Sequence, residues 1–260
     1  MTALSYYLSS TNNEIIKLKR TFAFWLTIIS ALIVPLLSFI LYLVKHEKMI
    51  PAEGENPWEN YMFKQIMNAI PFLAPMFIVL ITSLIIQIEQ KSHGIKHLFS
   101  LPIPKWSVYF GKLTIVIFSI ITTYIYFFLA ILVFGFLLGM FHSELGFLDF
   151  QPDYWKCIKM LGMSFIASFG IVGVQFWMSF RFKNFIVPLG IGMIMIIIGL
   201  IASRAPETIY FPYAYPVLLF SLGKNVPLIM GVSSITVYSL TCFVAASVLG
   251  YIDIKRLNVK

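Results

Sequence analysis

Long runs of apolar residues alternate with short polar segments along the whole chain. About 20 consecutive apolar residues in a helix cross the ~30 Å hydrocarbon core of a bilayer. Six runs reach that length almost without charged residues, and we expect transmembrane helices at 22–44, 66–88, 113–141, 157–180, 185–203 and 225–252. The pattern therefore predicts an all-α integral membrane protein in which residues 1–260 form a single transmembrane domain.

The composition and the distribution of charge agree with a membrane protein. Of the 260 residues, 59% are hydrophobic and only 12% are charged, whereas about 25% of the residues of soluble domains are charged. With the N-terminus in the cytoplasm, the cytoplasmic segments hold 12 Lys and Arg against 3 acids, and the opposite side holds 7 against 8. Because positive residues concentrate on the cytoplasmic side, we expect a multi-pass protein of the cytoplasmic (inner) membrane with both termini inside. We expect this basic charge to lie at the inner face of the membrane and not to form a nucleic-acid surface, so we expect no nucleic-acid partner.

The first 21 residues have the periodicity of an amphipathic helix. Apolar residues such as Leu4, Leu8, Ile15 and Leu18 share one stripe of a 3.6-residue helix, and basic residues occupy other faces. We expect residues 1–21 to lie on the cytoplasmic membrane surface and to lead into the first span. The alternative is that residues 1–21 form no surface helix and only place basic residues before the first span.

Residues 89–112 form a polar segment between the second and third spans, with the sequence EQKSHGIKHLFSLPIPKWSVYFGK. A helix through Leu98 would end before Pro102, because the residue preceding a proline avoids the helical conformation. Pro104 suits the first turn of a following helix. We expect a helix–turn–helix elbow in the cytoplasm, which is a suitable shape for docking a partner protein.

A proline-rich segment precedes the last span. Four prolines in PETIYFPYAYPVLLFSLGKNVP, residues 206–227, prevent a continuous helix. We therefore expect residues 204–224 to form an external segment. It either re-enters the membrane from outside or lies at the interface as a tyrosine-rich loop.

The expected spans contain a few polar and small residues. Lipid penalises polar side chains unless they face protein or water, so the candidates for lining a translocation path are Asn68, Gln87, Tyr124 and Gln175. Gly135 and Gly139 form a GxxxG motif that lets helix backbones approach closely. Such a motif serves either packing within one subunit or the contact between two subunits.

Three segments together resemble the permease subunits of ABC-2-type exporters, especially the branch that exports peptides or drugs or confers lantibiotic immunity. They are NNEIIKLKRTFAFWL near the start, EQKSHGIKHLFSLPIPKWSVYFGKL after the second span, and YFPYAYP before the last. The resemblance implies that the N-terminal helix connects to the spans, that the cytoplasmic elbow couples to a cytosolic ABC ATPase, and that the external segment closes the pathway.

The resemblance also assigns roles to particular residues. The elbow residues that would couple the permease to the ATPase are Glu89, Lys91, His93, Gly94, Lys96, His97, Phe99, Leu101 and Pro102. The external cap would consist of Tyr210, Phe211, Pro212, Tyr213, Tyr215 and Pro216. The chain itself would bind no cofactor, since ATP and magnesium belong to the partner ATPase. A second permease subunit, identical or related, would complete the pathway.

The residues themselves favour an external motor. The sequence contains no phosphate-binding loop, and the expected spans hold none of the mid-membrane ionisable groups typical of ion-coupled carriers. Glu89, His93 and His97 could share a helix face and ligate a metal, but Gly94 stands where the zinc-hydrolase motif needs glutamate. We therefore expect a docking face and no metal site.

The predicted function is the permease subunit of an ATP-driven exporter, which is not itself an enzyme. The apolar spans suit an amphipathic or hydrophobic substrate, such as a peptide, a drug or a lipid. The alternative is a membrane scaffold or signalling subunit whose elbow docks another protein and moves nothing.

Overall fold

The computed structural model describes residues 3–19, 21–52, 54–91, 104–221, 228–229 and 232–256. Of residues 89–91, 206, 228–229 and 232 within these ranges, only the backbone is described. The elements follow in the order α1 (Ala3–Lys19), α2 (Phe22–Val44), η1 (His46–Lys48), α3 (Pro57–Ala69), α4 (Leu73–Lys91), α6 (Lys105–Phe141), η2 (Ser143–Leu145), α7 (Tyr154–Ala167), α8 (Phe169–Arg181), α9 (Ile186–Ala202), η3 (Pro206–Tyr210), η4 (Pro212–Ala214), α10 (Tyr215–Ser221), β1 (Leu228–Ile229), β2 (Val232–Ser233) and α11 (Ser234–Arg256).

The predicted multi-pass, helical architecture is confirmed. Helices α2, α6 and α11, together with α7–α8 taken as Tyr154–Arg181, are long and apolar enough to cross a membrane. Helices α3 and α4 form a fifth candidate as one broken span. Helix α9 is equally apolar but has only 17 residues. The strands β1 and β2 are two residues each and pair antiparallel.

The expected helix at 66–88 is divided in two. Helix α3 begins at Pro57, where the Asn56 side chain accepts a hydrogen bond from the Trp58 N–H, and it ends at Ala69. The chain then bends by 47° before α4. Pro71 lies in this break, and a proline has no N–H for the helix ladder. The broken span places α3 against α2, α6 and α7, and α4 against α8 and α9.

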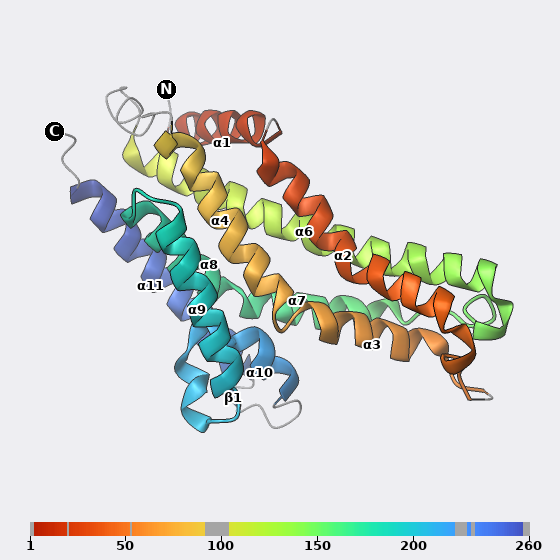
Figure 1. Cartoon of the computed structure of the whole chain (residues 1–260). Coiled ribbons are helices and arrows are strands. Elements are labelled where there is room, and N and C mark those ends of the chain that lie inside the picture. The colour runs from red at the N-terminus through yellow and green to blue at the C-terminus, as the bar shows by residue number, and fades with distance from the viewer. Residues whose placement is uncertain are drawn as a thin grey trace.

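Two groups of helices make up the molecule (Figure 1). Helices α2 and α6 run side by side and form an arm with α3 and α7, while α4, α8, α9 and α11 pack as a bundle. Helix α1 lies at the end of the molecule where both termini are found, and α10 lies at the opposite end of the bundle. The chain therefore returns to the end at which it starts.

Glycines allow the closest helix contacts. A Cβ on Gly173 of α8 would lie 2.9 Å from the Phe243 Cα of α11, so only glycine permits this approach. On α6, Gly135 lies against the ring of Trp58 and Gly139 lies against Leu148. The GxxxG pair therefore packs within the subunit, which was one of the two expected uses.

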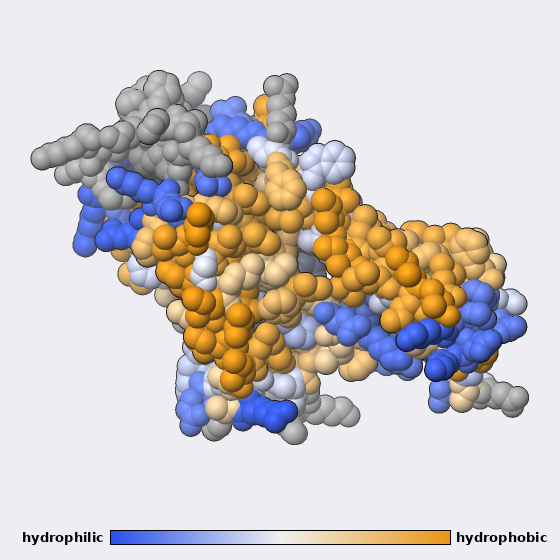
Figure 2. All heavy atoms as spheres, in the orientation of Figure 1, coloured by the Kyte–Doolittle hydropathy of each residue, from blue (hydrophilic) through white to orange (hydrophobic). Residues whose placement is uncertain are grey.

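The surface suits a bilayer. In Figure 2, polar residues gather near the end that carries the termini and along the lower edges, and apolar surface lies between them. Many large apolar side chains are exposed, such as Ile201 on α9, which is 78% exposed. Exposure of this extent is a liability in water but is favourable against lipid tails.

Candidate functional site: helix joints and a membrane pocket

An ion pair joins α1 to the start of α6. Lys112 Nζ lies 2.6 Å from Glu14 Oε2, and Lys17 Nζ lies 2.8 Å from Glu14 Oε1. The side chains of Lys112 and Glu14 are 1% and 7% exposed. Charged groups are rarely buried unless they are paired, and here one carboxylate accepts from two ammonium groups. The joint lies at the end of the molecule where both termini are found (Figure 1).

The same contacts control the protonation of Glu14. Burial raises the pKa of its carboxyl, but the charge of Lys112 and the hydrogen bonds from Lys112 and Lys17 lower it more. The pKa of Glu14 is therefore below its ordinary value of 4.5. The carboxylate stays ionised at neutral pH and can hold both lysines.

Neighbouring residues bring α1 this close to α6. A Cβ on Gly111 would lie 3.0 Å from Ser10 Oγ, so a larger residue would push the helices apart. Tyr7 Oη lies 2.6 Å from Thr114 Oγ1, and the Tyr7 ring stacks on Trp106 with the centroids 6.5 Å apart. Gly111 and Lys112 thus provide space and charge at adjacent positions.

This joint was missed from the sequence. Glu14 and Lys112 both lie in the segments that carry the family resemblance, but nothing in either segment indicates that the two side chains meet. One signal was present: Glu14 is a single acid among basic residues. Its partner, 98 positions away, could not be read from local periodicity.

The predicted coupling elbow lies mostly outside the described residues. Helix α4 extends to Lys91 and α6 begins at Lys105, with Pro104 at its N-cap. Glu89 and Lys91 belong to the last turns of α4, and their side chains are not described. The remaining predicted coupling residues lie outside the described part, namely His93, Gly94, Lys96, His97, Phe99, Leu101 and Pro102. The coupling role of these residues stays a prediction. The expectation that Glu89, His93 and His97 form a docking face and not a metal site also stays a prediction.

Gln175 of α8 connects four elements inside the bundle. Its Nε2 donates to Ser83 Oγ of α4 at 3.1 Å and to the Pro188 carbonyl of α9 at 3.0 Å. Its Oε1 accepts from Tyr213 Oη of η4 at 2.9 Å. The Gln175 side chain is completely buried. It therefore clamps these helices together and lines no open path in this conformation.

The predicted external cap is packed into the bundle. A Cβ on Gly170 of α8 would lie 3.2 Å from Pro212 Cβ and from Tyr215 Cε2. A Cβ on Gly199 of α9 would lie 3.1 Å from the backbone of Tyr213. Residues 212–215 thus fit between two glycine-bearing helices. Of the predicted cap residues, Tyr213, Tyr215 and Pro216 are buried, Phe211 and Pro212 are half-buried, and Tyr210 is 69% exposed.

The four predicted path residues do not meet at one place. Gln175 lies in the clamp just described. Tyr124 of α6 shares a hydrogen bond of 3.0 Å with Ser164 Oγ of α7. Asn68 is exposed on α3, and Gln87 is half-buried near the end of α4. A path lined by all four stays a prediction.

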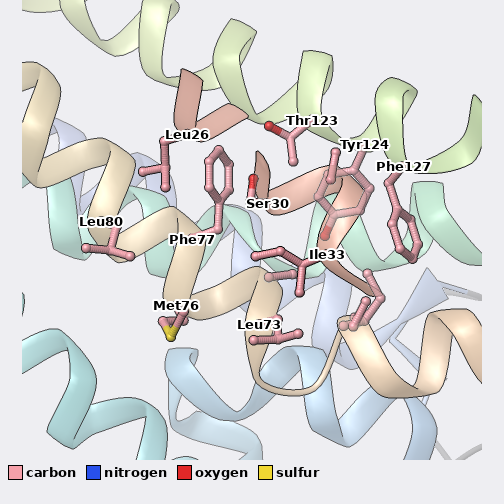
Figure 3. Close-up of a pocket in the computed structure, with 14 residues that line it drawn as sticks. Leu26, Ser30, Ile33, Leu73, Met76, Phe77, Leu80, Thr123, Tyr124 and Phe127 are labelled. Carbon is pink, nitrogen blue, oxygen red and sulfur yellow. The ribbon is translucent and has the colours of Figure 1, made fainter. Parts of the chain in front are cut away.

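A mainly apolar pocket of about 90 Å³ lies beside Tyr124, at the break between α3 and α4. Helices α2, α4 and α6 surround it, with side chains such as Phe77 and Phe127 in its walls (Figure 3). On the face in Figure 2, the surface between α2 and α4 is hollowed. Sequence reasoning selected Tyr124 but not the pocket, because the pocket results from the bend of the broken span.

Metal chemistry finds no support in the described part of the chain. No group of three or more His, Cys, Asp or Glu side chains in these residues could hold a metal ion. The described part instead contains the joint between α1 and α6, an apolar pocket, and residues 212–215 packed between α8 and α9, which we call the plug.

Comparison with known families identifies the class. The family model described as ABC-2 family transporter protein matches residues 11–199. The chain therefore belongs to the ABC-2 family of transporter proteins, and it is a membrane permease of the kind that partners an ABC ATPase. Neither the search of curated proteins nor that of solved structures finds a match.

Proposed function

We propose that this chain is the permease subunit of an ATP-driven exporter in the cytoplasmic membrane. It would work with a separate ABC ATPase, which binds ATP and magnesium, and with a second permease subunit, identical or related. The observation that carries this proposal is the joint of Glu14 and Lys112. The joint ties the N-terminal helix to α6 at Lys112, the last residue of the elbow expected to contact the ATPase.

The described contacts provide two routes for movement from the elbow. One end of the elbow leads into α6, whose Lys112 and Thr114 hold α1. Helix α1 continues into α2, which packs along α6. The other end of the elbow is α4, whose Ser83 is bonded to Gln175 and, through it, to Tyr213 of the plug. Displacement of α4 would therefore loosen the plug and open the pathway away from the cytoplasm.

The position of the termini supports six crossings. Both termini lie at one end of the molecule (Figure 1), which requires an even number of spans. With four helical spans and one broken span, α9 would supply the sixth. At 1.5 Å per residue its 17 residues are about 26 Å long, and a bilayer thins locally around a span that is slightly short. The excess of positive charge near the termini favours a cytoplasmic location for them.

The substrate class follows from the walls of the molecule. Among the described residues, most of the large buried side chains of the spans are apolar. An amphipathic or hydrophobic molecule, such as a peptide, a drug or a lipid, suits these walls better than a small ion. We propose export of such a peptide, including a role in antimicrobial-peptide immunity, because the three segments noted in the sequence resemble that branch.

The first experiment is purification of the tagged protein from its native membrane in mild detergent. Mass spectrometry then identifies what co-elutes, and ATP hydrolysis is measured on the preparation. We expect an ABC ATPase at near-equal stoichiometry. A preparation without ATPase and without hydrolysis would contradict the exporter and favour a scaffold that docks another protein.

Coupling is tested with variants in the purified complex. Gly94→Pro, and charge reversal at Lys91 and Lys96, should uncouple hydrolysis from transport while the protein stays folded. Lys156→Met is the matched control, because its exposed pair with Glu59 lies far from the elbow in the chain. Normal transport by the elbow variants would count against the coupling assignment.

A further inference from the structure

A groove of about 450 Å³ lies between α3 and α7, in the arm of the molecule. Two contacts join the beginnings of these helices. Asn56 Nδ2 donates to the Gln151 carbonyl at 3.0 Å, and Lys156 Nζ lies 3.4 Å from Glu59 Oε1. Because the N-terminal ends of the two helices meet, α3 and α7 run in the same direction along the groove.

The end of the groove at which both helices begin is acidic. Glu55, Glu59 and Asp153 line it together with one base, Lys156, which gives a net charge of −2. Lys156 pairs with Glu59, and neither Glu55 nor Asp153 forms an ion pair with another described residue. Asp153 accepts the Lys156 backbone N–H at 2.9 Å and so caps α7, which leaves its charge without a basic side chain. Two carboxylates are therefore available to a cation.

The spacing of these acids does not suit a metal ion. Among the described residues, no group of three or more His, Cys, Asp or Glu side chains could hold one. The carboxylates of the groove therefore do not converge on a single small ion. An organic ammonium or guanidinium group is larger, and it carries several N–H donors that can reach separate carboxylates.

Apolar side chains line the remainder of the groove. They are Met62, Phe63 and Ile66 of α3 and Met160 of α7. At 1.5 Å per residue, Ile66 lies about 10 Å along the helix axis from Glu59. Phe63 is 50% exposed and Met160 is half-buried, so both offer apolar surface to a ligand. Negative charge and apolar surface thus follow one another along a single cavity.

We infer that the groove between α3 and α7 is a binding site for a small organic cation with one apolar tail. The ammonium or guanidinium group lies between Glu55 and Asp153, and the tail lies along Phe63 and Met160. Charge complementarity fixes this orientation, because the cation donates to the carboxylates while the tail gains free energy by leaving water. This inference goes beyond the proposed function and does not rest on it, since binding requires neither the ATPase nor transport.

The test uses an n-octylammonium that carries a photoreactive diazirine in its tail, with the purified full-length protein in phosphatidylcholine nanodiscs at pH 7. These lipids have no net charge, so they do not concentrate the probe electrostatically. Mass spectrometry locates the labelled peptides. We expect saturable labelling of residues 55–66 and 153–160, and competition by unlabelled n-octylammonium. Label spread over all spans without competition would overturn the inference.

The carboxylates are tested by the preference for n-octylammonium over 1-octanol as competitors, since 1-octanol has the same tail and no charge. Glu55→Gln with Asp153→Asn should reduce this preference about tenfold, the effect of two partly exposed charge contacts. Asparagine still caps a helix, so this double variant stays folded. The matched control is Glu47→Gln with Asp149→Asn, which removes two exposed acids outside the groove and should leave the preference unchanged. An equal loss in both double variants would mean that general surface charge, and not the groove, attracts the probe.

The tail is tested at Phe63. Phe63→Ala should weaken competition by n-octylammonium roughly fivefold, because apolar area against the tail is lost. It should not change competition by ethylammonium, whose tail is too short to reach this side chain. Phe118→Ala is the control, because Phe118 is 55% exposed on α6 and lies outside the groove. No loss in Phe63→Ala, or an equal loss in Phe118→Ala, would contradict the assigned position of the tail.

Discussion

At the scale of single residues, buried polar side chains carry most of the specific information in this protein. Glu14 and Lys112 are buried as an ion pair, and Lys17 also contacts the Glu14 carboxylate. Trp58 of α3 is completely buried, and its ring N–H donates to the Phe147 and Phe150 carbonyls. In both cases the partner is remote in sequence, so the residue type alone did not predict its place.

Replacing one member of the Glu14–Lys112 ion pair should destabilise the protein more than replacing both members. Glu14→Gln leaves the Lys112 charge buried and should lower the free energy of unfolding by about 3 kcal/mol. The double variant Glu14→Gln with Lys112→Met should recover much of that loss. Denaturant-induced unfolding in mild detergent measures both values.

The matched control is Glu59→Gln, which breaks the exposed pair of Glu59 and Lys156 at 3.4 Å. An exposed pair contributes about 0–1 kcal/mol, so this variant should be nearly neutral. A similar loss in Glu14→Gln and Glu59→Gln would contradict the buried character of the joint.

The lowered pKa of Glu14 predicts a dependence on pH. A carboxyl with a folded-state pKa below its unfolded value contributes stability that is present above the unfolded pKa. That stability is lost as the pH falls below 4.5 and through the lowered pKa. The difference in melting temperature between the wild type and Glu14→Gln should therefore be large at pH 7 and should shrink below pH 4.5. A difference that does not change over this range would refute the pKa assignment.

At the scale of elements, breaks and close contacts decide what the helices can do. The 47° bend between α3 and α4 turns one apolar run into two helices and creates the pocket. The prolines of the external segment end the regular helix, and Gly170 and Gly199 then allow residues 212–215 to enter the bundle. The prolines correctly predicted that this segment is not one continuous helix. How deeply the segment inserts between the helices depends on Gly170 of α8 and Gly199 of α9, which the prolines do not indicate.

The packing of residues 212–215 against α9 can be tested with substitutions on α9. Gly199→Val should lower the free energy of unfolding by about 1–3 kcal/mol, because its side chain would press on the Tyr213 backbone. Gly190→Val is the control on the same helix, since a Cβ at this position would meet no atom within 4 Å. Equal stability of the two variants, measured by thermal unfolding in detergent, would show that the segment does not rest on α9.

At the scale of the whole molecule, the two ends have different tasks. The end with the termini holds the buried joint and a second pair, in which Arg181 Nη1 lies 3.1 Å from Asp253 Oδ1 and ties α8 to α11. The opposite end of the bundle holds the packed plug. This division agrees with the proposed exporter, in which the end that contacts the ATPase would stay assembled while the other end opens.

The six-span topology makes a prediction about α9. In a background with Cys157→Ser and Cys242→Ser, single cysteines at Lys183 and Arg204 should lie on opposite sides of the membrane. A membrane-impermeant maleimide added to intact cells should label Arg204→Cys, and should label Lys183→Cys only after permeabilisation. Labelling of both from one side would mean that α9 does not cross.

Much of the architecture could be predicted from the sequence because lipid imposes simple rules. Backbone groups in a bilayer must be satisfied within the segment, so a long apolar run becomes a helix, and α2 spans the range expected for the first span, 22–44. The expected range of 66–88 was less accurate, because proline indicates a break but does not set its angle. The elbow assigned to ATPase coupling stays a prediction outside the described residues.

The sequence by itself thus determined the helical class, the membrane setting and the family, since these depend on run length, charge and local motifs. Only the tertiary structure decided which polar groups meet: Glu14 with Lys112, and Gln175 with Tyr213. It also decided that an apolar pocket lies at the bend of the broken span. These features arise from the packing of helices that are far apart in the chain. They depend on the direction of side chains and on glycine contacts between helices, which the local periodicity of the sequence does not show.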